Sequence, residues 1–81
     1  MICSVKLFAV ARQRVGQSAI EIDLPELADI GRLRAALVEQ YPALAEVVAH
    51  ARLAIDSEYA SDSTPIPANA EIALIPPVSG G

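Results

Sequence analysis

Two segments near the start of the chain alternate between apolar and polar residues, which is the period of a strand with one buried face. The first segment runs from Ile2 to Val10, and its apolar side carries Cys3, Val5, Leu7 and Ala9. The second segment runs from Ala19 to Leu24. Because a short polar segment with one glycine joins them, we predict a hairpin of two strands.

The middle of the chain changes to a helical period. Apolar residues recur three and four positions apart, at Ile30, Leu33, Leu37 and Tyr41. Asp29 is placed to act as the N-cap, and Pro42 follows the end of the pattern, where a proline cannot continue the hydrogen-bond ladder. We predict one main amphipathic helix here, and residues 43–50 are able to form a short second helical stretch.

Strand character returns in the last third of the chain, over residues 52–59 and again over residues 71–75, with a turn-rich segment between them. The predicted order is β-β-α-β-β, with a strand at each end. One helix that covers one face of a mixed sheet is an economical way to bury the apolar residues. We therefore predict an α+β domain on the ubiquitin-like β-grasp plan, in which the first and last strands lie side by side and parallel.

The residues after the last strand are mainly proline and glycine. Pro76 and Pro77 cannot donate ladder hydrogen bonds, so the strand has to end at Ile75. The fixed φ angles of the two prolines favour an extended, polyproline-like path. We therefore divide the chain into a domain over residues 1–75 and an extended tail, PPVSGG, over residues 76–81.

The tail becomes thinner toward its end. Val78 and Ser79 are followed by Gly80 and Gly81, which have no side chains. Six extended residues span at most about 20 Å. We therefore expect residues 76–79 to contact a partner protein while the glycines enter a narrow channel in it.

Composition and charge narrow the range of partners. The chain is 53% hydrophobic, but no apolar run approaches the roughly 20 residues of a membrane span. The net charge is −4, and the basic residues form no stripe with interleaved aromatics, so we expect neither a nucleic-acid nor a membrane partner. An acidic chain favours a partner with a basic docking surface. The first residues lack the features of a signal peptide and the single cysteine suits a reducing compartment, so we expect a cytoplasmic protein.

Few residues offer chemistry of their own. Cys3 shares its strand face with apolar residues, and His50 has no second metal ligand at a suitable spacing, so we interpret both as structural and predict no metal site. Asp56 and Glu58 are interpreted as a solvated strand edge. The chain has no glycine-rich loop that would hold a phosphate, so we expect it to bind no cofactor.

Phe8 does not fit the alternation of apolar and polar residues in the first strand, because it is aromatic but lies on the polar face of that strand. If the first and last strands are neighbours, Phe8 and Ile75 form an exposed apolar patch near the root of the tail. We predict that this patch docks a partner, with Phe8 as an aromatic anchor. Arg12, just after the strand, is a weaker candidate for a contact.

Two segments, LFAVARQRVG near the start and EIALIPPVSGG at the end, with a single main helix between them, resemble the small subunit of molybdopterin synthase. The similarity extends over the whole chain in length and element order, and PPVSGG is its specific part. The resemblance implies a β-grasp fold and a protein that carries sulfur without being an enzyme on its own.

The resemblance also implies the site and the partners. In that family an ATP-dependent activating enzyme adenylates the carboxyl group of the terminal glycine, which is then converted to a thiocarboxylate. Here that residue is Gly81, and it is preceded by Gly80, which also lacks a side chain. ATP is consumed by the activating enzyme. The large subunit uses the sulfur to form the molybdopterin dithiolene, in a heterotetramer of two small and two large subunits.

Three alternatives remain open. Sulfur carriers of thiamine and of cysteine biosynthesis are similar in fold and in their terminal Gly-Gly. A ubiquitin-like modifier joins its terminal glycine to lysines of target proteins, and the tail permits this as well. In the third alternative the chain is a plain interaction domain, its terminal glycines arise by chance, and Gly81 undergoes no chemical change.

Overall fold

The two alternating segments pair as antiparallel strands, as predicted. β1 (Ile2–Leu7) and β2 (Ala19–Asp23) lie side by side. The computed structural model describes residues 1–77, and within them three more strands complete a sheet in the order β2-β1-β5-β3-β4. These strands are β3 (Arg52–Ile55), β4 (Glu58–Ala60) and β5 (Ile72–Ile75).

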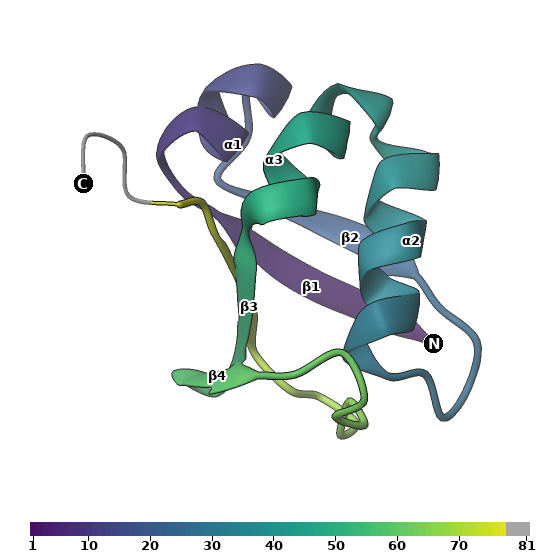
Figure 1. Ribbon diagram of the computed structural model, residues 1–81. Helices are drawn as coiled ribbons and strands as arrows, with labels where there is room; N and C mark the ends of the chain where they lie inside the picture. The colour runs from purple at the N-terminus through teal and green to yellow at the C-terminus, as the bar shows by residue number, and fades with distance from the viewer. Residues whose placement is uncertain (78–81) are drawn as a thin grey trace.

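The first and last strands lie at the centre of the sheet and run parallel to each other. Val5 is opposite Ile72, and Leu7 is opposite Leu74. Because the pair is parallel, β1 and β5 end at the same edge of the sheet (Figure 1). The predicted adjacency is confirmed, and with it the α+β, β-grasp arrangement of a mixed sheet.

The helices lie together on one face of the sheet (Figure 1). α2 (Ile30–Gln40) is the predicted main helix, and the Asp29 carboxylate accepts a hydrogen bond of 2.9 Å from the backbone N–H of Arg32, as expected of an N-cap. A short 3-10 helix, η1 (Pro42–Leu44), and α3 (Ala45–His50) form the second helical stretch.

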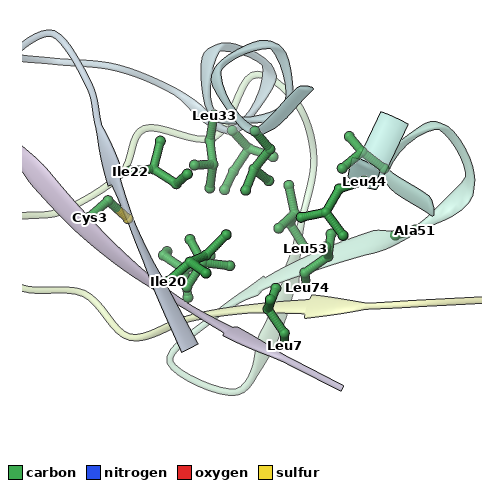
Figure 2. Close-up of a cluster of buried hydrophobic side chains, with 14 of the residues drawn as sticks. Cys3, Leu7, Ile20, Ile22, Leu33, Leu44, Ala51, Leu53 and Leu74 are labelled. Atoms are coloured by element: carbon green, nitrogen blue, oxygen red, sulfur yellow. The ribbon is translucent and has the colours of Figure 1, made fainter. Parts of the chain in front are cut away.

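The core lies between the sheet and these helices, and Figure 2 shows side chains from both layers meeting there. Every second residue of β1 is buried, so the period of two in the sequence does set the face of the strand. The completely or almost completely buried large side chains are Val5, Leu7, Ile22, Ile30, Leu33, Leu37, Leu44, Leu53, Ile72 and Leu74.

The prediction is wrong between the first two strands. β1 ends at Leu7 rather than Val10, and Ala9–Val15 forms a helix, α1, where a simple connection was expected. Ala11 is fully buried and Val15 packs on the core, so this helix has an apolar side of its own. It ends at Gly16, whose φ of 80° is the left-handed conformation that glycine adopts freely.

The segment expected as one strand over residues 52–59 is two strands, β3 and β4, joined by a tight hairpin. Asp56 and Ser57 have φ angles of 48° and 73°, which suits the primed turns that close two-residue hairpins. Asp56 therefore lies in the turn instead of sharing a strand edge with Glu58, and its carboxylate accepts a hydrogen bond of 2.9 Å from the backbone N–H of Glu71.

Arg34 ties α2 to the end of α3. The Arg34 guanidinium donates hydrogen bonds of 2.9 and 2.8 Å to the backbone carbonyls of Val48 and Ala51, at the end of α3, and one of 2.7 Å to the Asp62 carboxylate. α3 leads directly into β3, so these bonds also fix where β3 begins, at Arg52.

Candidate functional site

The root of the tail is set by the central strand pair. β5 ends at Ile75, and the chain continues through a half-buried Pro76 to an exposed Pro77. Figure 1 shows this part of the chain leaving the sheet on the side where α1 lies. Predicted site residues Val78, Ser79, Gly80 and Gly81 lie outside the described residues.

Phe8 and Ile75 occupy the same end of the central strand pair. Leu7 and Leu74 are opposite each other and buried, and Phe8 and Ile75 are the next residues along the two parallel chains. Phe8 lies just after β1, but its backbone remains extended, with φ −132° and ψ 156°. The alternation therefore continues through Phe8, which is turned away from the core and is 46% exposed, while Ile75 is partly exposed. The role of this pair in docking stays a prediction.

Two further residues extend this surface, and the sequence analysis missed both. Arg52 is opposite Ile75 in the β3–β5 pair, and its Cζ lies 4.8 Å from the centroid of the Tyr59 ring. Tyr59 is 61% exposed and pairs with Ala54 of β3. The open face of the sheet thus carries two aromatic residues, an aliphatic residue and a cation near the end of β5. We call Phe8, Arg52, Tyr59 and Ile75 the docking face.

The hairpin turn explains why Tyr59 was missed. In one continuous strand, residue 59 would share the face of Leu53 and Ile55, which is the core face. The two-residue turn at 56–57 reverses the chain, and it places Tyr59 opposite Ala54 on the other face. A turn signal in the Asp56–Ser57 pair was the available clue, although the pair lacks the glycine that usually marks such a turn.

The helix side of the tail root is also accessible. A hollow of about 400 Å³ is lined by Val10, Arg14, Glu46, Val47, His50 and Pro77. Arg14 and Glu46 form an exposed ion pair of 3.5 Å across it. Arg12, the predicted weaker contact, is exposed on α1 and has no ion-pair partner among residues 1–77. A protein that surrounded the tail would therefore meet the docking face on one side of it and this hollow, which has both apolar and charged residues, on the other.

Other candidate chemistry is sparse in the described part of the chain. Cys3 is buried, and burial raises the pKa of its thiol, so the thiol stays protonated and is a poor nucleophile. No group of three or more potential metal ligands occurs within residues 1–77. None of the helices there is both long and apolar enough to span a bilayer.

Comparison with known proteins identifies the family. The family model described as the ThiS family matches residues 5–81. The chain belongs to the ThiS family. A similar protein is the molybdopterin synthase sulfur carrier subunit of Caenorhabditis elegans, which is 42% identical over 79 residues, covering 95% of this chain and 94% of the relative. The predicted membership in the molybdopterin synthase small-subunit family is thereby confirmed.

Solved structures of similar proteins have the same fold as this ThiS-family chain. SAMP1 from Haloferax volcanii superimposes with a TM-score of 0.85 at 31% identity, covering 100% of both chains. Subunit 1 of the molybdopterin converting factor from Pyrococcus furiosus gives a TM-score of 0.83 at 26% identity, covering 96% of this chain and 99% of that one. The β-grasp prediction therefore rests on solved neighbours as well as on the strand order.

Proposed function

We propose that this ThiS-family chain is the sulfur carrier subunit of a molybdopterin synthase and that the sulfur is carried as a thiocarboxylate on Gly81. The observation that carries the proposal is the identity of 42%, over nearly the full length of both chains, to a protein of that name. The family match extends through residue 81, so it includes the terminal glycines.

The proposed chemistry explains why a terminal glycine is useful. A carboxylate is a poor electrophile until it has a leaving group, so an activating enzyme first transfers AMP from ATP to the Gly81 carboxylate and releases pyrophosphate. Hydrosulfide delivered by a sulfur donor then attacks the acyl carbon, a C–S bond forms, and AMP leaves. The resulting thiocarboxylate is itself a nucleophile. Both steps occur in the active sites of partners, where a side chain on the last residue would crowd the attacked carbon.

The described residues supply docking rather than catalysis in this proposal. The docking face, with Phe8 as its anchor, sits against the synthase large subunit, while Pro76 and Pro77 direct the tail away from the sheet. Arg12 is an additional contact at the same edge. Two small and two large subunits form the assembly, and this chain binds no cofactor itself. We place the reaction in the cytoplasm, because the single, unpaired cysteine of the chain suits a reducing compartment.

A reconstitution with purified proteins tests this function. The chain is prepared with a thiocarboxylate on Gly81 and mixed with the synthase large subunit and the precursor of molybdopterin. The thiocarboxylate is expected to return to the carboxylate as the dithiolene appears. The matched control replaces the large subunit by the thiazole-forming enzyme of thiamine biosynthesis. Sulfur transfer in the control alone would contradict the molybdopterin assignment and favour the thiamine route.

One observation favours a second candidate function. SAMP1 of Haloferax volcanii, at 29–31% identity, is a small archaeal modifier protein by name, so a chain of this fold is also suited to protein conjugation. Conjugation and sulfur transfer share the adenylated glycine and differ in the nucleophile that attacks it. Isopeptide-linked adducts of this chain, found in its own cells by mass spectrometry, would support the modifier function.

A further inference from the structure

Arg52 is a preorganised cation on the docking face. Its guanidinium lies over the ring of Tyr59, with 4.8 Å between Cζ and the ring centroid. It has no ion pair and no side-chain hydrogen bond to any residue in the described range 1–77. An arginine stacked in this way keeps its charge, and its N–H groups remain available to an acceptor in the plane of the guanidinium.

The charges of the chain are unevenly distributed between its two ends. Arg12 and Arg52 lie at the edge where β1 and β5 end, and neither is paired within residues 1–77. Glu46 also lies near the root of the tail, but it is paired with Arg14, and other acidic residues lie elsewhere. Asp23 lies opposite Ile2, at the other end of β1, and Asp56 and Glu58 lie at the far end of β3. The edge from which the tail leaves is therefore locally basic, although the net charge of the chain is −4.

From this arrangement we infer that the synthase large subunit presents a carboxylate to Arg52 and that the Arg52–Tyr59 pair is a specificity determinant of docking. The inference rests on the proposed function for the identity of the partner. It differs from the expectation drawn from net charge, which favoured a basic docking surface, because a docking partner responds to the charges it meets at close range.

The geometry suits a charged contact at the centre of an interface. A guanidinium is able to donate two parallel hydrogen bonds to a carboxylate. Because stacking on the Tyr59 ring already restricts the Arg52 side chain, binding costs less conformational entropy. Ile75, opposite Arg52, supplies apolar surface that excludes water from the contact. Tyrosine and arginine are also the residue types most often found to dominate binding energies.

The test compares two substitutions that change the net charge equally. Arg52→Met keeps much of the apolar stem and removes the cation, and we expect it to raise the Kd for the large subunit roughly tenfold, a typical loss for a charge-assisted hydrogen bond. Arg32→Met is the control, because Arg32 is exposed on α2 and makes no ion pair within residues 1–77. It should leave the Kd unchanged. Titration calorimetry at low and moderate salt measures both.

Further arms identify the role of the ring and of the partner's charge. Tyr59→Phe keeps the platform for Arg52 and should preserve the Kd, whereas Tyr59→Ala should weaken binding. Arg52→Glu should weaken it more than Arg52→Met does, and a Glu→Arg or Asp→Arg change on the large subunit should recover part of that loss. The salt dependence of the Kd should be smaller for Arg52→Met than for the wild-type chain.

The outcomes separate this inference from the proposed function. If the wild-type chain binds the large subunit and Arg52→Met binds equally well or more tightly, the inference is overturned and the proposed function stands. Equal effects of Arg52→Met and Arg32→Met would also overturn it, because they would indicate a response to net charge alone. A wild-type chain that does not bind the large subunit at all would overturn both.

Discussion

Deletion of Gly81 is expected to abolish sulfur transfer without changing the thermal midpoint of the protein. The reacting carbon would then belong to Gly80, one residue short of the position that the partner's active site holds. Even small misplacements of a reacting group cost large factors in rate. The buried core of the described residues contains nothing beyond Leu74, so stability should change by about 0.5 kcal/mol or less.

A variant with one residue added after Gly81 complements this deletion. It keeps every native residue and moves the terminal carboxylate, so it should abolish transfer equally. Activity with the large subunit and differential scanning calorimetry measure the two effects separately. A large loss of stability in either variant would mean that the tail packs on the domain. It would contradict the prediction that the tail extends away from the domain and enters a channel in a partner.

Leu7→Ala and Phe8→Ala should have opposite consequences, although the residues are neighbours. Leu7 is almost completely buried, so its truncation should leave a cavity and cost roughly 2–5 kcal/mol of unfolding free energy. Phe8 is turned away from the core, so its truncation should leave the fold nearly intact and weaken docking to the large subunit by about 1–3 kcal/mol.

Chemical denaturation and calorimetric binding on both variants distinguish these effects. The comparison depends on the alternation of side chains along an extended backbone, which continues through Phe8. If Phe8→Ala unfolds the protein while Leu7→Ala leaves it stable, the face assigned to Phe8 is wrong, and the docking face fails with it.

The strand pairing and the main helix were predictable because each has a clear period. The alternation around Val5 places it in the core, and the spacing from Ile30 to Leu37 does the same for α2. Capping chemistry placed the start of that helix correctly at Asp29. The adjacency of β1 and β5 followed from the element order, because the first and last strands of this plan are central neighbours.

The two wrong predictions, at residues 9–15 and 52–59, have a common cause. The alternation of apolar and polar residues does not show where the chain changes direction. Ala9 continues the alternation of β1 by its type, yet it begins α1. The buried Ala11 and partly buried Val15, four residues apart, together with Gly16, were the signals for that helix. The Asp56–Ser57 turn was hidden in the same way, and with it the position of Tyr59 on the docking face.

The central claim is that the carboxyl group of Gly81 accepts sulfur, and intact mass spectrometry tests it most directly. The chain is incubated with its activating enzyme, ATP and a sulfur source, and its mass should rise by about 16 Da as one oxygen is replaced by sulfur. Fragmentation should place the gain on the last residue, and omission of ATP should prevent it. An unchanged mass with an activating enzyme that thiolates its other carriers would contradict the account.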